Sequence, residues 1–165
     1  MAENEQTAVD KQLAIQKIYV KDFSFESPHT PQVFARNDWS PKTDLNLRSS
    51  HTAGSDNSHE VVLTVSIEAK EGDQTIFLVE LQQAGLFHIN GYTADEFKAL
   101  VGSFCPNILF PYAREAVATM VSKGGFPEFI LQPINFDALY AQGMAQAKAR
   151  AEAEAGGGDG SGAAH

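Results

Sequence analysis

Cysteine, positive charge and long apolar runs are scarce in this chain, and each shortage excludes a class of protein. Only one of the 165 residues, Cys105, is a cysteine, so no internal disulfide can form and a disulfide-stapled secreted scaffold is excluded. No apolar segment approaches the roughly 20 residues that a membrane-spanning helix needs. The first residues, MAENEQTAVDKQ, lack the basic start and apolar run of a signal peptide. We therefore expect a soluble protein of a reducing compartment that does not insert into a membrane.

Basic residues are outnumbered by acidic ones. The chain has 12 Lys and Arg against 21 Asp and Glu, which gives a formal net charge of −9. Because like charges repel, neither nucleic acid nor an anionic membrane surface is expected as the main partner. A basic or apolar partner fits this charge better. The length and the hydrophobic fraction of 43% indicate one folded domain.

Residues that carry catalysis or bind metals are also few. The stretch FCPNILFPYARE places Cys105 among apolar neighbours, which raise the pKa of a thiol instead of activating it. The histidines are scattered, and no glycine-rich phosphate-binding loop precedes a predicted helix. His51, Asp56 and His59 are close enough in sequence to meet in one loop, although a solvated loop is the simpler interpretation. We expect no catalytic residue, no metal and no cofactor.

The chain divides into three parts. Residues 1–12 are polar and predict a flexible acidic N-terminus. Residues 13–150 form one domain without internal repeats. Residues 151–165, AEAEAGGGDGSGAAH, have too little apolar mass to fold and predict a disordered Ala/Glu/Gly tail.

The first half of the domain has the period of β-strands. Apolar and polar residues alternate in four segments, at residues 15–26, 43–47, 59–70 and 75–89. Three prolines in residues 27–41 remove ladder donors, so this stretch predicts a long crossover and not a central strand. SSHTAGSDNS, before the third strand, predicts a loop, and EGDQ predicts a tight turn.

The second half has the period of helices. Thr93 and Glu96 form a capping-box pattern at a helix start. Pro106 and Pro111 are expected to break or restart that helix, because interior proline loses a hydrogen bond and clashes with the preceding turn. The pair at 124–125, Gly-Gly, predicts its end, and a last helix is expected from residue 135 or 136.

Strands first and helices second predict the α+β class. We expect a four-stranded antiparallel sheet with a long proline-rich crossover after the first strand, followed by helices packed on one face.

Several connections carry more apolar residues than a simple connection requires. These are Phe34 and Trp39 in the crossover, Phe126 and Phe129 before Pro133, and the run 108–110. Two interpretations remain open at this point. The residues either cap the core at the ends of the sheet, or they line an exposed groove that binds an apolar partner.

Residues 15–139 closely resemble the SecB family of protein-export chaperones. The resemblance rests on several long motifs in the family's order: IQKIYVKDFSFE, the crossover with Val33-Phe34 and Asp38-Trp39, HEVVLTVSIEAK, FLVELQQAGLF, CPNILFPYARE and PINFDALY. It implies a cytoplasmic, ATP-independent chaperone and not an enzyme. Such a protein holds unfolded preproteins and delivers them to the SecA motor, and it assembles as a homotetramer, a dimer of dimers.

The resemblance also implies the residues of three surfaces. SecA is expected to bind Asp22, Glu26, Leu78 and Glu80, where acidic residues around a leucine suit a short basic segment. The alternative for these four is a merely solvated outer face. Unfolded clients are expected to bind Phe34, Trp39, Leu45, Leu47, Phe136, Leu139, Tyr140 and Met144. The oligomer interface is expected to contain Phe77, Val79, Leu81, Tyr112, Ala116 and Met120.

Two other classes of protein would explain the same sequence. An apolar small-molecule carrier would use the aromatic residues to line a closed pocket and would be monomeric. An enzyme would use Cys105 or a histidine, and its thiol would react much faster than a free thiol.

Overall fold

The computed structural model describes residues 9–36, 38 and 40–157. Its elements in chain order are β1 (Gln12–Glu26), the 3-10 turn η1 (Gln32–Ala35), β2 (Lys42–Ala53), β3 (Ser58–Glu71), β4 (Gln74–Asn90), α1 (Ala94–Ala99), the π turn η2 (Leu100–Phe104), α2 (Cys105–Lys123) and α3 (Phe136–Gly156). The strands precede the helices, so the predicted α+β class is confirmed.

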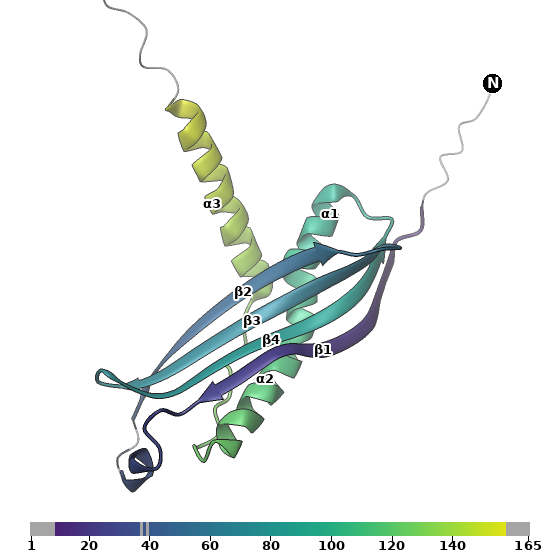
Figure 1. Cartoon of the computed structure of the whole chain (residues 1–165). Helices are drawn as coiled ribbons and strands as arrows, with labels where there is room; N and C mark the ends of the chain where they lie inside the picture. The colour runs from purple at the N-terminus through teal and green to yellow at the C-terminus, as the bar shows by residue number, and fades with distance from the viewer. Residues whose placement is uncertain (1–8, 37, 39, 158–165) are drawn as a thin grey trace, which may run out of the picture.

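The four strands form one antiparallel sheet in the order β1-β4-β3-β2 (Figure 1). The four-stranded antiparallel sheet predicted from the sequence is therefore confirmed. β1 and β2 follow each other in the chain but occupy opposite edges, with β4 and β3 between them. The β3–β4 hairpin turns at Gly72, whose φ of 61° lies in the left-handed region that favours glycine.

β2 is longer than the sequence predicts. The expected strand covered residues 43–47, but β2 pairs with β3 in unbroken register along its whole length. The loop predicted for SSHTAGSDNS is therefore wrong for residues 49–53. Their polar side chains fit an edge strand, where they are exposed to water. The turn itself contains Asp56 and Asn57, whose φ values are 54° and 60°.

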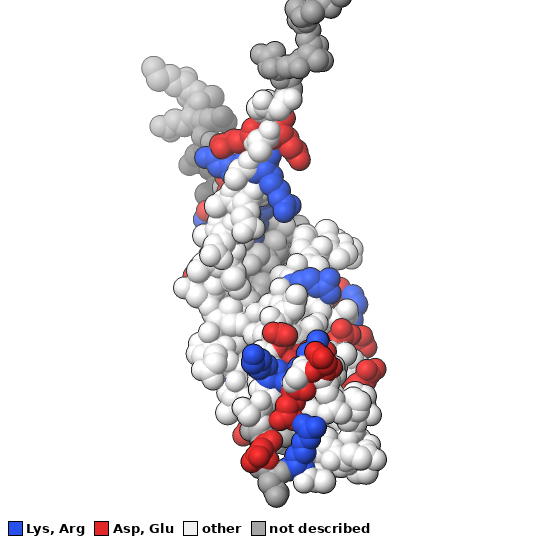
Figure 2. All heavy atoms as spheres, turned by 90° about the vertical axis from the view of Figure 1, so that its left-hand side faces the viewer, with Lys and Arg blue, Asp and Glu red and all other residues white. Residues whose placement is uncertain are grey.

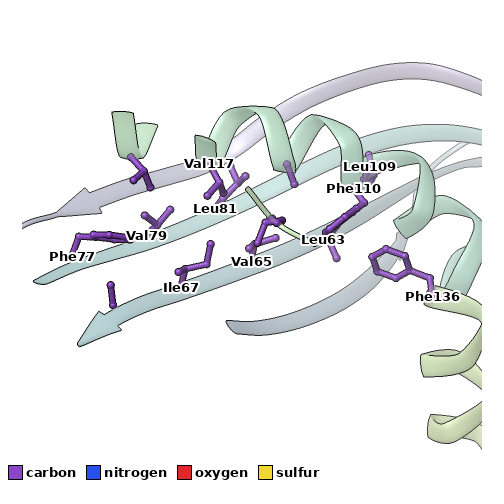
Figure 3. Close-up of a cluster of buried hydrophobic side chains, with 14 of the residues drawn as sticks. Leu63, Val65, Ile67, Phe77, Val79, Leu81, Leu109, Phe110, Val117 and Phe136 are labelled. Atoms are coloured by element: carbon purple, nitrogen blue, oxygen red, sulfur yellow. The ribbon is translucent and has the colours of Figure 1, made fainter. Parts of the chain in front are cut away.

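The core lies between the inner face of the sheet and α2 (Figure 3). Every second residue of β3 and β4 points to this side, as the period of 2 requires. The labelled side chains that meet there are Leu63, Val65, Ile67, Phe77, Val79, Leu81, Leu109, Phe110, Val117 and Phe136. Each is at most 6% exposed, and burial of such a side chain stabilises the fold by about 1.5–3 kcal/mol. β3, β4 and α2 are therefore the stable centre of the subunit.

The first helix begins as predicted and then continues where a break was expected. Thr93 accepts a hydrogen bond from the backbone N–H of Glu96, whose side chain accepts one from the backbone N–H of Thr93. This confirms the capping box. The chain stays helical from there to Lys123, so the expected break at Pro111 is wrong, whereas at Pro106 the α-helix restarts after the π turn, as the alternative expectation had it.

Two local features explain how the helix tolerates its prolines. Pro106 lies in the first turn of α2, directly after η2, where the backbone N–H of Cys105 bonds to the oxygen of Leu100, five residues back. This wider turn accommodates a residue without an N–H. Pro111 deprives the carbonyl of Asn107 of its helical partner, but both residues are exposed, so water can replace the bond.

α3 starts at the expected place but packs against the body only through its first five residues, Phe136 to Tyr140. Asn135 caps it by accepting a hydrogen bond of 3.0 Å from the backbone N–H of Ala138. Phe136 is its buried residue, and the helix then projects away from the sheet (Figure 1). It runs to Gly156, into the tail for which disorder was expected, because alanine and glutamate favour helix even without tertiary contacts. No helix in the described ranges is long and apolar enough to cross a membrane.

Candidate binding surfaces

The four residues predicted to bind SecA lie together on the outer face of the sheet. Glu26 of β1 is directly opposite Leu78 of β4, and Ser24 is directly opposite Glu80. Asp22 follows on the same face of β1, two residues before Ser24. We call these five residues the acidic outer patch. Within the described residues no Lys or Arg forms an ion pair with its three carboxylates.

The residues predicted to bind clients fall in three places. Leu45 and Leu47 lie on the inner face of β2, opposite the buried Ile67 and Val65 of β3. Leu45 is 44% exposed, whereas Leu47 is partly buried against the core. The inner face of β2 thus presents apolar surface at the edge of the sheet.

Phe34 lies in η1, at the end of the sheet away from α3 (Figure 1). The residue is 49% exposed, and its ring packs against the ring of Phe126, with 5.3 Å between the centroids. Phe34 thus belongs partly to the aromatic cluster at this end of the core. Trp39 lies outside the described residues.

α3 carries the other predicted client residues. Leu139 and Met144 are 47% and 48% exposed, and Tyr140 lines a pocket of about 520 Å³ between η2 and the start of α3. Phe136 is different: it is buried against the ring of Phe110, with 5.5 Å between the centroids, so it is a core residue and its prediction as a client contact is wrong. Figure 2 shows a largely uncharged surface between the charged side chains at the end of the sheet and those near the end of α3.

The predicted oligomer interface needs one correction. Phe77, Val79 and Leu81 are 3%, 0% and 0% exposed because the same chain covers them, with α2 and, at Phe77, with the rings of Phe25 and Phe126. Alternation predicted correctly that they share a face, but a second subunit cannot reach them. The interface prediction is therefore wrong for these three residues.

The rest of the predicted interface lies on α2. Tyr112 is 50% exposed, and Ala116 and Met120 are partly buried beside it. Sequence reasoning missed two further exposed apolar groups, Phe104 at the start of α2 and Ile15 with Val20 on β1. β1 has register shifts at both of these positions, so a simple period of 2 does not reveal which face they occupy.

Cys105 is a packing residue. Its side chain is fully buried, and burial raises the pKa of its thiol to about 12. The thiol is thus protonated at physiological pH and is a poor nucleophile. Among the described residues no group of three or more His, Cys, Asp or Glu side chains could hold a metal ion.

Two of the histidines considered from the sequence do meet. The Nε2 atom of His51 and the Nδ1 atom of His59 are 2.9 Å apart, and both rings contact the ring of Phe97. Burial, followed by the charges of His51 and His88, lowers the pKa of His59, which favours its neutral form at pH 7. Asp56, in the adjacent turn, forms no hydrogen bond or ion pair with either ring in the described structure.

A polar bridge that the sequence did not suggest crosses the outer face of the sheet. Tyr19 of β1 donates a hydrogen bond to Glu60 of β3, and it passes over Ala84 of β4, its direct cross-strand neighbour. Lys21 forms an ion pair of 2.7 Å with the same carboxylate. The hydrogen bonds from Lys21 and Tyr19 hold the pKa of Glu60 below its usual value, while burial and Glu60 raise the pKa of Tyr19 to about 12. The small side chain of Ala84 leaves room for this bridge.

Comparison with known proteins gives a consistent result. Residues 5–147 match the family model described as preprotein translocase subunit SecB. The chain is 53% identical over 147 residues to the protein-export protein SecB of Nitrosococcus oceani, covering 87% of this chain and 90% of that protein. It is also 53% identical over 140 residues to the SecB of Methylococcus capsulatus, covering 85% of this chain and 88% of that protein.

A solved structure has the same fold at much lower identity. It is a SecB-like chaperone of Mycobacterium tuberculosis in complex with a ChAD peptide from the HigA1 antitoxin. The TM-score is 0.62 at 18% identity, and the match covers 74% of this chain and 90% of that one. At this identity the likeness establishes the fold alone.

Proposed function

Since this chain belongs to the SecB family of protein-export chaperones, we propose that it acts as an ATP-independent cytoplasmic homotetramer that delivers preproteins to the SecA motor. The family is non-enzymatic and holds preproteins for Sec translocation. We propose which surfaces of this chain hold the preprotein, which partner receives it and which surface joins the subunits.

The acidic outer patch is the proposed SecA site, and it is the single observation that supports this partner most. Asp22, Glu26 and Glu80 surround Leu78 on adjacent strands, and all three acidic residues are exposed. Unpaired carboxylates on a flat surface are available to a basic segment, which they attract and orient. The leucine offers that segment a small apolar contact.

The proposed client surface is apolar and spread over several elements. Leu45 and Leu47 on β2, and Leu139 and Met144 on α3, offer exposed or half-exposed aliphatic area. Apolar burial has no strong directional requirement, so such area accepts many unfolded sequences. We include Phe34 and the proline-rich connection 27–41, which we propose to be the family's crossover.

Holding an unfolded chain is costly in entropy, and oligomerisation compensates for this cost. Each ordered client side chain loses about 0.5–1.5 kcal/mol of freedom on binding. Several client surfaces on one tetramer make the later contacts intramolecular, which raises their effective concentration. We propose that the outward side of α2, with Phe104, Tyr112, Ala116 and Met120, contributes to that assembly.

Size-exclusion chromatography with light scattering tests the assembly and the client together. We expect a tetramer alone and a larger complex when a reduced, unfolded preprotein is added, but no complex with the same protein folded. A monomer at micromolar concentration would contradict the tetramer.

The SecA site has its own test. The double variant D22K/E80K is expected to remain tetrameric and to bind clients nearly as well as wild type, but to bind SecA much more weakly. Binding of wild type to SecA should also weaken as salt is added. Undiminished SecA affinity of the double variant at low salt would remove this site from consideration.

A further inference from the structure

A lysine lies on the outer face of the sheet, directly beside the acidic outer patch. It is Lys21, which the β1–β4 register skips between Val20 and Asp22, so it is the extra residue of a β-bulge. In a regular strand consecutive side chains point to opposite faces, and Lys21 would point away from the face that carries Asp22. Because of the bulge, the ammonium of Lys21 instead reaches Glu60 across the outer face, at 2.7 Å.

A lysine whose charge is not neutralised at this position would oppose the proposed SecA site. Lys21 directly precedes Asp22, and its side chain is a flexible four-carbon stem that ends in a compact charge. An ammonium paired with Asp22 would cancel one of the charges that attract a basic segment. It would also repel that segment directly. The patch therefore attracts a basic partner best when another carboxylate neutralises Lys21.

Glu60 supplies that carboxylate from β3. Its side chain is only 22% exposed, so its ion pair with Lys21 is partly shielded from water and salt, and Tyr19 holds the carboxylate in place with a second hydrogen bond. On the basis of the function proposed above, we infer that Glu60 is a positioning residue for SecA binding. It holds the charge of Lys21 away from Asp22 and so leaves the acidic outer patch open to a basic partner.

A second lysine on the outer face of β1 lies too far from the patch to have the same effect. Lys17 is opposite Leu86, whereas Asp22 is opposite Gln82. Four residues of β4 span about 13 Å, which exceeds the screening length of about 8 Å in physiological salt. The charge of Lys17 is thus largely screened at the patch, while that of Lys21, the neighbour of Asp22 in the chain, is not.

The experiment measures the affinity of the full chain for SecA at low salt in wild type, E60Q, K21M and K21M/E60Q. E60Q leaves the charge of Lys21 without its partner, so affinity should fall about 1.5- to 5-fold, the effect of one exposed ion pair. In K21M/E60Q that charge is absent, so the double variant should bind as K21M does. The double-mutant cycle therefore separates an effect of Glu60 through Lys21 from a direct contact of Glu60 with SecA.

The matched control is E96Q at the start of α1. It leaves Lys11 without a partner in an ion pair of the same length, 2.7 Å, which does not involve the outer patch. Glutamine at this position still suits a capping box, so the helix start should persist. E96Q is expected to bind SecA as wild type does. Circular dichroism and light scattering check that each variant is folded and tetrameric.

Three results would overturn the inference while wild type binds SecA. These are an unchanged affinity in E60Q, a loss in E60Q that is equally large in the K21M background, and an equal loss in E96Q. K21M alone should bind SecA at least as tightly as wild type, and a lower affinity would overturn the inference even if E60Q did not fold. A wild type that does not bind SecA would instead refute the proposed partner, and this inference with it.

Discussion

Replacing Glu80 by lysine is expected to strengthen the fold of the subunit and to weaken the proposed binding to SecA. Glu80 stands opposite the neutral Ser24, with Asp22 and Glu26 as its diagonal neighbours on β1. Its diagonal neighbour on β3, Glu68, is already paired with Lys70 at 3.5 Å. In wild type, two unpaired like charges therefore repel Glu80 across the β1–β4 pair.

The size of the effect follows from distance and screening. Diagonal neighbours are about 7 Å apart, and unit charges at that distance in water interact by about 0.6 kcal/mol. Physiological salt reduces this to about 0.25 kcal/mol. E80K turns two such repulsions into attractions, so the free energy of unfolding should rise by about 1 kcal/mol at most. Binding to SecA should fall about two- to thirtyfold, because an exposed ion pair worth about 0.2–1 kcal/mol becomes a repulsion of similar size.

The assay compares two measurements on the same variant. Urea unfolding at a fixed subunit concentration gives the stability, and titration with SecA at low salt gives the affinity. The control is E152K on α3, which makes the same change of charge away from the sheet. The reasoning is refuted if E80K is less stable than wild type, if its SecA affinity is unchanged, or if E152K loses as much affinity.

Three further changes test other parts of the structure. The double variant L45A/L47A should suppress client aggregation less well than wild type while the tetramer persists. As a control, L45A alone should have nearly the free energy of unfolding of wild type, because Leu45 is 44% exposed. Full suppression of aggregation by the double variant would contradict the client surface. The thiol of Cys105, buried and with its pKa raised to about 12, should react with a thiol reagent only as fast as the subunit unfolds; rapid labelling of folded protein would show that it is accessible. The pKa of Glu60 is lowered in the folded state, chiefly by Lys21, so its stabilising effect is present above its unfolded value of 4.5 and is lost as pH falls through the folded value. The stability difference between wild type and E60Q should accordingly shrink below pH 4.5, and a difference that does not change with pH would contradict the bridge.

Local signals in the sequence predicted the parts of the fold that depend on neighbouring residues. The alternation in residues 59–70 and 75–89 corresponds to β3 and β4, which are central strands with one fully buried face. Thr93 caps its helix as the capping-box pattern predicted, and α3 begins at Phe136, one of the two predicted starts. These signals act within a turn or a strand, so one sequence is enough to read them.

The errors concern contacts between distant parts of the chain. The alternation of apolar and polar residues placed Phe77, Val79 and Leu81 on one face of the strand. It does not tell whether the same chain or a second subunit covers that face. In the structure α2 covers it. The polar residues 49–53 were predicted to form a loop, but they belong to an edge strand. The sequence alone does not show that β2 lies at the edge of the sheet, where polar side chains are tolerated. The Tyr19–Glu60 bridge likewise depends on two strands that do not neighbour each other.

The order of the strands also determines when each can form during synthesis. β1 emerges from the ribosome first, yet its sole neighbour in the described sheet is β4, the last strand to be made. At about 5–20 residues per second, β1 waits on the order of several seconds before residue 90 has been added. During that time β1 has no partner strand, and the apolar side chains of Ile18, Phe23 and Phe25 have no core to pack against. A protein of a family that holds the preproteins of others thus leaves its own first strand unshielded while it is being translated.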